Sequence, residues 1–303
     1  MTNWRYFGMV LVALFFIGVP SLDARAQTNT RPVKLGVTTV LVERELYLQT
    51  EMVNYVGQKI GEPIELVQKR SFQAILDMLE KGEIDAAFVC GSLYTLGREE
   101  FGAEILAVPQ MYAEGPIYRA YLIVPVDSSA KSLKDLKGQR FAFVDPLSVT
   151  GRLVTLIDLL KMGERPQNFF QAALFTHSHS ASIEAVADKL VDGASVMSTV
   201  WDSLTLMDPS LTSRVKVIQK SESLPMTPLI VRPGLDPSLK AMLRSVFLKM
   251  EEDPAGAGIL KRMSIRKFVM VPDSYYDGIR ALQLYASKSL KHRGAQVKAV
   301  PKK

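Results

Sequence analysis

The chain has 303 residues, 48% of them hydrophobic and 22% charged, which is ordinary for a globular protein large enough for two domains. The formal net charge is +6, but no basic stripe is interleaved with aromatic residues, so we expect no nucleic-acid partner. The single cysteine, Cys90, excludes an internal disulfide, and its apolar surroundings predict a buried thiol.

The first 26 residues have the pattern of a secretory signal peptide. Arg5 supplies a positive charge, residues 6–19 are almost continuously apolar, and Ala24-Arg25-Ala26 is a small-x-small cleavage signal. The apolar core is short for a membrane span, and no later stretch approaches the roughly 20 apolar residues that a span needs. We therefore predict cleavage before Gln27 and a soluble protein exported to the periplasm.

Beyond residue 26, predicted strands and helices alternate, a pattern typical of parallel sheets covered by helices. The first series has strands over residues 33–40, 64–67, 84–89 and 105–108, and helices over 46–60 and 72–79. The second series has strands over 121–126, 140–144, 172–175 and 194–200, with helices from 150 and 180. The chain ends with strands over 215–218 and 229–231 and helices over 239–250, 254–260 and 275–290.

The two series align at a constant offset of 107 residues. Residues 71–74 fall on 178–181, and the aspartates that precede the third strand of each series, Asp85 and Asp192, coincide. Repetition of a βαβ unit indicates architecture, so we predict two similar α/β lobes. Their expected boundaries divide the chain into residues 27–118 (first lobe), 119–222 (second lobe) and 223–303 (return to the first lobe).

Open α/β sheets bind ligands at the carboxyl ends of their strands, beside the amino-terminal ends of helices. Two facing lobes would therefore form a cleft between loops from both sides. The expected loops are 38–43, 70–72 and 90–94 from the first lobe, and 145–151, 177–180 and 197–202 from the second.

Residues 141–153 have the features of an anion site. An apolar strand is broken by Pro146, and Ser148, Thr150 and Gly151 stand before a run of helical periodicity. Free backbone N–H groups of a first helical turn and two hydroxyls can bind an anion, and glycine permits close approach to the main chain. Serine and threonine are also the usual helix N-caps, so capping is the alternative interpretation, and both roles can coexist.

Four further side chains fall in the expected cleft loops, each with a structural alternative. His179 begins a helix, where a histidine can bind a ligand or cap the helix. Tyr94 can bind through its phenol or pack its ring, and Phe72 can pack or close over a ligand. Trp201 follows a predicted strand and can form a wall of the site or part of the core.

Motifs of the common enzyme classes are missing from the sequence. No Cys, His or acidic cluster has zinc spacing, and Ser148-Val149-Thr150-Gly151 is not a nucleophile elbow. The phosphate-binding and dinucleotide-binding glycine motifs do not occur. We therefore predict no catalytic residues, no metal and no cofactor.

Five segments stand in a specific order along residues 31–276. They are Arg70-Ser71-Phe72 followed by Lys81-Gly82-Glu83-Ile84-Asp85-Ala86-Ala87-Phe88, then Gly91-Ser92-Leu93-Tyr94, Asp145-Pro146-Leu147-Ser148-Val149-Thr150-Gly151, Ser178-His179-Ser180-Ala181-Ser182 and Ser223-Leu224-Pro225-Met226-Thr227-Pro228. In this order the segments resemble the periplasmic phosphate-, phosphite- and phosphonate-binding proteins of ABC transporters.

The resemblance implies a two-lobed periplasmic binding protein of type II, with a mostly parallel sheet flanked by helices in each lobe and the ligand cleft between the lobes. In that family the hydroxyl loop, its backbone N–H groups and a histidine hold the phosphonate oxygens, and a tyrosine closes from the first lobe. Carried over by position, these residues are Ser148, Thr150, Gly151, His179 and Tyr94.

Three positions depart from the family pattern. Val149 stands where relatives often have another hydroxyl, Ser180 replaces the acid after the histidine, and Met197 stands where relatives often carry an aspartate that could meet an aminoalkyl group. These departures imply a smaller oxyanion, or a substituent other than aminoalkyl.

The function implied by the resemblance is capture of a phosphonate, phosphite or phosphate, and its delivery by a monomer to the permease of an ABC importer in the inner membrane. Two alternatives stay open. One is a periplasmic sensor module for another small anion. The other is a secreted phosphohydrolase, which would need metal-binding carboxylates near the anion loop, where only Asp145 is present.

Overall fold

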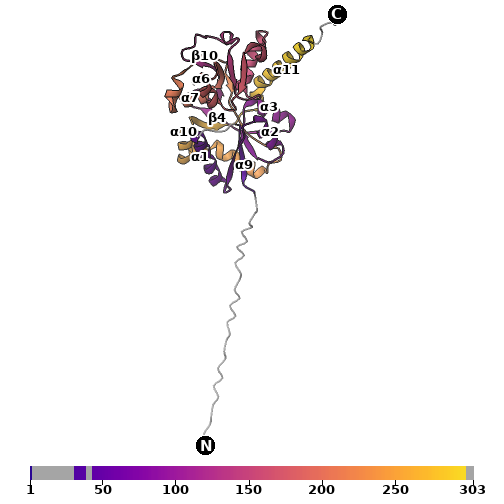
Figure 1. The fold of residues 1–303 in the computed structure, drawn as a ribbon. Helices are drawn as coiled ribbons and strands as arrows, with labels where there is room; N and C mark the ends of the chain where they lie inside the picture. The colour runs from indigo at the N-terminus through magenta and orange to yellow at the C-terminus, as the bar shows by residue number, and fades with distance from the viewer. Residues whose placement is uncertain (2–30, 39–42, 298–303) are drawn as a thin grey trace. The chain divides into compact units, whose positions relative to one another are not determined.

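The computed structural model describes residue 1, residues 31–38 and residues 43–297 (Figure 1). The predicted signal peptide, apart from Met1, and residues 39–42 of the predicted cleft loop 38–43 lie outside the described residues. The residues from Pro32 onward form one compact unit. In the described part of this unit, no helix is long and apolar enough to cross a membrane.

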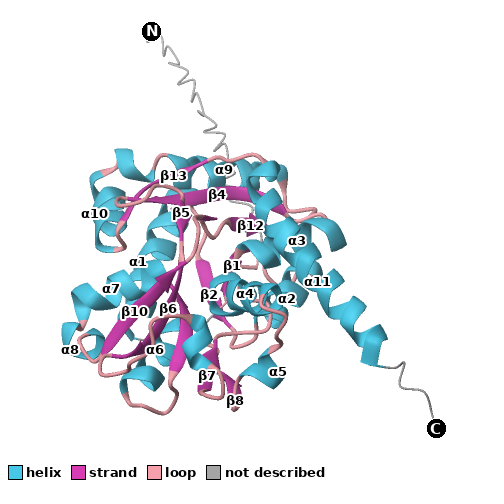
Figure 2. Ribbon diagram, turned by 90° about the horizontal axis from the view of Figure 1, so that it is seen from above, coloured by secondary structure: helices cyan, strands magenta, loops and turns pink. Residues whose placement is uncertain are grey.

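Two sheets form the framework, and the strands of the second gather on one side of the molecule in Figure 2. The first sheet has the order β2-β1-β3-β12-β4-β13 and the second the order β8-β7-β9-β6-β10. The first contains β1 (Val33–Val37), β2 (Ile64–Gln68), β3 (Ala86–Phe88), β4 (Glu104–Met111), β12 (Leu229–Val231) and β13 (Ile265–Val269). The second contains β6 (Ala120–Pro125), β7 (Arg140–Phe143), β8 (Ala172–Phe175), β9 (Gly193–Met197) and β10 (Val215–Lys220).

Pairing in both sheets is mixed, whereas the sequence predicted mostly parallel sheets. Strand β1 runs parallel to β2 and β3, and β7 runs parallel to β8 and β9, as the βαβ pattern requires. The remaining pairs are antiparallel, including β12 with β3 and β6 with β9. Strands β6 and β12 each follow a crossing from the other lobe. Each enters its sheet at the edge where the parallel strands end, so it runs in the opposite direction to them.

Apolar side chains alternate across the first sheet and create a core on each face. Leu35, Ala86 and Val231 pack on the face covered by α1, α9 and α10. Ala87 and Ile230 point to the other face, where α2, α3 and the beginning of α11 cover them. These helices are α1 (Glu43–Ile60), α2 (Phe72–Glu80), α3 (Gly91–Glu100), α9 (Pro237–Leu248), α10 (Pro254–Arg262) and α11 (Asp277–Val297).

The second sheet is covered in the same way. Ile123 and Val196 pack under α6, α7 and α8, whereas Phe141 and Phe143 pack with α4 and α5 on the other face. Phe141 stacks on Phe170 with ring centroids 4.4 Å apart, which closes this core. The helices are α4 (Val154–Lys161), α5 (Pro166–Phe169), α6 (His179–Ala187), α7 (Ser198–Met207) and α8 (Pro209–Thr212).

The internal repeat is confirmed by the hydrogen bonds of its two aspartates. Asp85 accepts a bond from the N–H of Lys34 at 3.0 Å, and Asp192 accepts one from the N–H of Arg140 at 2.9 Å. In both lobes the aspartate therefore ties the third strand to the first. The first strands correspond at an offset one residue shorter than predicted, because Lys34 is matched by Arg140 and not by Phe141.

The two lobes are joined at two crossings and by one helix. Strand β5 (Ile117–Tyr118) pairs with β11 (Leu224–Pro225) where the chain passes between the sheets. Helix α11 extends toward the carboxyl terminus in both views and packs on α3 of the first lobe and on α4 of the second (Figures 1 and 2). Leu156 and Ile157 of α4 are buried with Ala286 of α11.

Candidate ligand-binding site

A π-helical turn, rather than the start of a regular α-helix, follows the polar loop after β7. Residues Val149–Leu153 form the turn, which continues directly into α4. The N–H of Leu153 donates to the carbonyl of Ser148 at 2.9 Å, and the N–H of Val154 donates to the carbonyl of Val149. Turns of this kind occur frequently at functional sites.

Ser148 and Thr150 are both buried in this turn. The Oγ of Ser148 accepts a bond from the N–H of Gly151 at 3.0 Å, so Ser148 is an N-cap, while its own O–H proton can still be donated. Thr150 is 2% exposed, and its carbonyl accepts a bond from the hydroxyl of Ser195 at 2.5 Å. Capping by Ser148 is confirmed, and a ligand role for the two hydroxyls stays a prediction.

Gly151 is enclosed by protein on the side where a Cβ would stand. An added Cβ would lie 2.4 Å from the Cβ of Val144 and 2.8 Å from the Oγ of Ser148. The sequence interpretation was that glycine gives a ligand access to the main chain. The space on its Cβ side is instead filled by the preceding strand and the cap, so tight packing accounts for the glycine.

The amino-terminal ends of α2 and α3 lie against the same loop. The N–H of Phe72, the first residue of α2, donates to Oδ2 of Asp145 at 3.3 Å. The hydroxyl of Ser92 in α3 donates to the carbonyl of Leu147. Two helix amino termini from the first lobe thus face the polar turn of the second, an arrangement that favours negative charge between them.

Helix α3 was missed by sequence reasoning, which placed residues 90–94 in a cleft loop. Cys90 is its N-cap residue, with Sγ 3.1 Å from the Oγ of Ser92, and burial raises the pKa of the thiol. The buried thiol is confirmed. The apolar spacing of Leu93 and Leu96 was the available signal for a helix at this point.

His179 begins α6 and is held by the end of strand β9. Its Nδ1 accepts a bond from the N–H of Met197 at 3.1 Å, so the ring proton of the neutral form lies on Nε2. Burial lowers the pKa of His179 to about 4. The neutral ring can therefore donate one hydrogen bond from Nε2 at neutral pH but carries no charge.

We expect this histidine to make the protein less stable in acid. Its pKa in the folded chain, about 4, lies below the ordinary value of 6.5, so between these values the unfolded chain binds more protons. The free energy of unfolding should then fall by at most about 3 kcal/mol between pH 7 and pH 4, and by less because the ring is partly exposed.

Urea unfolding at several pH values measures this effect. In His179→Asn the amide oxygen can still accept the bond from Met197, whereas the titration is removed. The pH dependence of the variant should be shallower than that of the wild type between pH 4 and 6.5 and parallel to it above. Parallel curves over the whole range would contradict the lowered pKa.

The hydrogen bond and ring contact of Tyr94, and the core packing of Trp201, involve residues outside the polar turn. The phenol of Tyr94 donates to Asp273, and its ring packs against Tyr276 with centroids 4.9 Å apart. Burial raises the pKa of this phenol. Trp201 packs against the core of the second sheet from within α7, because β9 ends at Met197 and not at residue 200.

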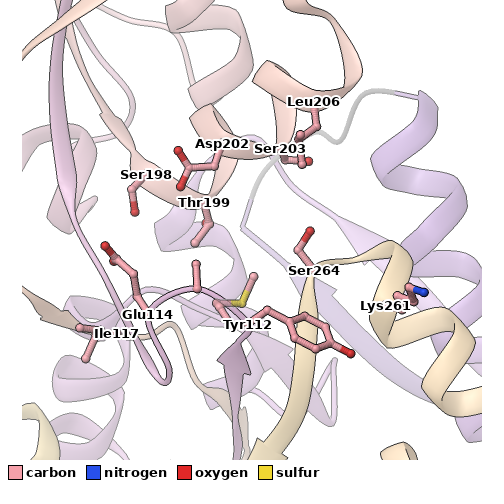
Figure 3. Close-up of a pocket in the computed structure, with 12 residues that line it drawn as sticks. Tyr112, Glu114, Ile117, Ser198, Thr199, Asp202, Ser203, Leu206, Lys261 and Ser264 are labelled. Atoms are coloured by element: carbon pink, nitrogen blue, oxygen red, sulfur yellow. The ribbon is translucent and has the colours of Figure 1, made fainter.

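Two adjoining cavities lie between the lobes. The outer one, of about 590 Å³, has Tyr112 and Glu114 on one side and Ser198 and Asp202 of α7 on the other (Figure 3). Burial, and then the charge of Glu114, raise the pKa of Asp202. The second cavity, of about 260 Å³, is called the inner cavity because its lining includes the buried side chains of Met52 and Met226. It shares four lining residues with the outer one, namely Met111, Thr199, Ser203 and Ser264.

The predicted residues thus form one group at the turn and a second group around it. Ser148, Thr150 and Gly151 lie at the turn, and Phe72 is hydrogen-bonded to Asp145 in the loop before it. His179 is hydrogen-bonded to Met197, which lines the inner cavity. Within the described ranges, no group of three or more His, Cys, Asp or Glu side chains could hold a metal ion.

Two relatives align with most of this chain. A phosphonates-binding periplasmic protein of Escherichia coli K12 is 23% identical over 283 residues, covering 91% of this chain and 83% of the relative. A phosphate-import protein, PhnD, of Mycolicibacterium smegmatis is 23% identical over 249 residues, covering 76% of this chain and 77% of the relative.

Solved structures show the same two-lobed fold. A binding protein component of an ABC phosphonate transporter from Pseudomonas aeruginosa superposes with a TM-score of 0.81 at 25% identity, covering 86% of this chain and 88% of that one. PhnD1 from Prochlorococcus marinus, in complex with methylphosphonate, gives a TM-score of 0.75 at 18% identity, covering 84% and 98%. The fold is therefore that of a type II periplasmic binding protein.

A family model spans residues 36–276. This range includes both crossings, the polar turn and both sheets, apart from the first residues of β1. It describes the periplasmic substrate-binding protein of phosphonate ABC transporters. With most of the chain matched and the fold shared, this protein belongs to the family of phosphonate ABC transporter substrate-binding proteins.

Proposed function

We propose that this chain captures a small phosphorus oxyanion, a phosphonate, phosphite or phosphate, and delivers it to the permease of an ABC importer. The observation that carries the proposal is the π-helical turn with its two buried hydroxyls, faced by the amino-terminal ends of α2 and α3. Ser148, Thr150 and His179 would bind the anion from the second lobe, and Gly151 would contribute by holding the turn in the shape that presents them.

The first lobe would contribute Phe72 and Tyr94. The hydrogen bonds of Phe72 to Asp145 and of Ser92 to Leu147 close the loop against the helix ends, so binding requires these lobe-to-lobe contacts to open and re-form around the anion. The paired strands β5 and β11 are the place for such a hinge. We place the lobes at residues 27–118 with 223–303, and at 119–222.

The remaining parts of the proposal concern processing and assembly. Cleavage of residues 1–26 would release a monomer into the periplasm, where it binds its ligand without converting it. Trp201 then becomes the only tryptophan, because Trp4 is the other one in the chain. Its emission would report ligand binding if α7 moves with the cleft.

Calorimetric titration of residues 27–303 with phosphate, phosphite, methylphosphonate and sulfate tests the proposal, with Trp201 emission recorded in parallel. We expect saturable binding of at least one phosphorus oxyanion, recovered unchanged after denaturation, and no binding of a neutral sugar. Failure of all three phosphorus anions to bind would overturn the proposed function. Recovery of a converted product would show an enzyme instead.

Removal of a hydroxyl should separate ligand binding from stability. A hydrogen bond to a charged group contributes about 1.5–3 kcal/mol, so Thr150→Val should weaken binding about tenfold to a hundredfold. Thr155 in α4 is also buried, at 4% exposed, and Thr155→Val is the matched control. Calorimetry of both variants, with their thermal unfolding, makes the comparison.

Ser148→Ala should lower both the stability of the protein and its affinity for the anion. Loss of the cap costs about 1 kcal/mol of stability, and loss of the O–H donor weakens binding as for Thr150. Variants at both positions that bind as tightly as the wild type would assign these residues to the fold alone.

A further inference from the structure

We propose that the inner cavity holds the hydrocarbon substituent of an alkyl- or arylphosphonate, so that the preferred ligand is an apolar organophosphonate and not an aminoalkyl one. The inference rests on the proposed function, since it takes the anion to lie at the polar turn. The turn would select the anionic group, and the inner cavity would select the substituent attached to it.

The lining of the inner cavity is dominated by flexible apolar side chains. Five of the 13 methionines in the whole chain line this one cavity. Methionine fills irregular space and adapts to different apolar partners, which suits a site for a hydrocarbon group. The methionines are Met52, Met111, Met197, Met226 and Met263, and the other apolar lining residues are Leu48, Phe88, Pro109, Val200 and Ile265.

Charge in the lining argues against an ammonium group. Among the described lining residues the only charged one is Arg262, and its guanidinium pairs with Glu51 at 2.8 Å. The polar members, Gln49, Thr199, Ser203, Thr227 and Ser264, are neutral. An ammonium buried among these residues would lose its hydration without meeting a carboxylate of this lining, because Glu114 and Asp202 line only the outer cavity. A hydrocarbon group has no such hydration to lose.

Met197 connects the cavity to the predicted anion site. Its N–H donates to His179 at 3.1 Å, and its side chain both lines the cavity and packs in the same cluster as Val149 of the π-helical turn. Ser148, Thr150 and His179 do not line the cavity, so a ligand with its anion at the turn would extend past Met197 into it once the lobe-to-lobe contacts open. Its volume of about 260 Å³ exceeds the roughly 150 Å³ that accommodates benzene in another protein.

The test is a calorimetric series with methyl-, propyl-, hexyl- and phenylphosphonate on the protein without its signal peptide. Each buried methylene should tighten binding about fourfold. 2-Aminoethylphosphonate, which has nearly the shape of propylphosphonate, should bind at least about tenfold more weakly than propylphosphonate because its ammonium must be desolvated. Equal or weaker binding of the longer chains, or preference for the amine, would overturn the inference.

Variants at Met197 locate the substituent. In Met197→Gln a polar amide replaces the thioether at similar length, so the ratio of hexyl- to methylphosphonate affinity should fall about fivefold. Met197→Leu keeps the lining apolar and should retain most of the ratio. Unchanged ratios in both variants would place the substituent elsewhere.

The two proposals fail in different ways. If methylphosphonate or phosphate binds and longer chains do not gain affinity, the inference about the cavity is wrong and the proposed function stands. If hexanoate or hexylsulfonate binds and no phosphorus anion does, the proposed function is wrong. Because the wild-type series alone decides the first question, a variant that does not fold leaves the test intact.

Discussion

Gly151→Ala is expected to destabilise the second lobe by about 3 kcal/mol, the upper end of the usual cost of overpacking. The new Cβ would lie 2.4 Å from the Cβ of Val144 and 2.5 Å from its Cγ2, far inside the 3.5–4.0 Å of a normal carbon contact. Rotation of the Val144 side chain cannot relieve a clash with its Cβ. The backbone of the strand end or of the π-helical turn must therefore move.

Ligand binding should fall together with stability, because the same movement displaces Ser148 and Thr150. Urea unfolding followed by calorimetry of the folded variant measures both. Gly278→Ala is the matched control, since Gly278 lies in the first turn of α11 with nothing within 4 Å of an added Cβ. That variant should be stabilised by up to about 1 kcal/mol.

The alternative from the sequence makes a different prediction for the same variant. If Gly151 serves mainly to let a ligand approach the main chain, Gly151→Ala should weaken binding strongly and leave the unfolding curve where it was. A stable variant with lost affinity would thus contradict the packing explanation.

Features set by short stretches of sequence were predicted well. The sequence predicted one helix over residues 72–79 and another from residue 180, and these helices begin at Phe72 and His179. Ser71 and Ser178 cap them by accepting bonds from the N–H groups of Ala74 and Ala181. A serine before an apolar periodic run is a local signal, so no tertiary information was needed. The same is true of the two aspartates before the third strands.

Features set by contacts between distant residues were not predicted. The bond from Phe72 to Asp145 joins residues 73 positions apart, and the bond from Tyr94 to Asp273 joins residues 179 apart. The π-helical turn itself depends on the fit of Gly151 against Val144, which a periodicity argument cannot supply. Inner-cavity methionines such as Met52 and Met226 likewise come together only through the fold.

Asp85 and Asp192, the aspartates of the internal repeat, allow the stability lost on removal of a carboxylate to be compared between the two lobes. Asp85→Ala should lower the free energy of unfolding by about 3 kcal/mol, because it leaves a guanidinium that is only 21% exposed and a strand N–H without their acceptor. The carboxylate is 5% exposed and bonds to Nε of Arg232 and to the N–H of Lys34, both at 3.0 Å.

Asp192→Ala removes the equivalent carboxylate of the second lobe and should cost only about 1 kcal/mol. Asp192 has three bonds to Arg140, at 2.9, 3.0 and 2.8 Å, and these lower the pKa of its carboxyl. It is nevertheless 31% exposed and its partner 44%, so water can replace the lost contacts. Urea unfolding of both variants decides between burial and bond count. A larger loss for Asp192→Ala would show that the number of bonds, and not their shielding from water, sets the stability of the repeated unit.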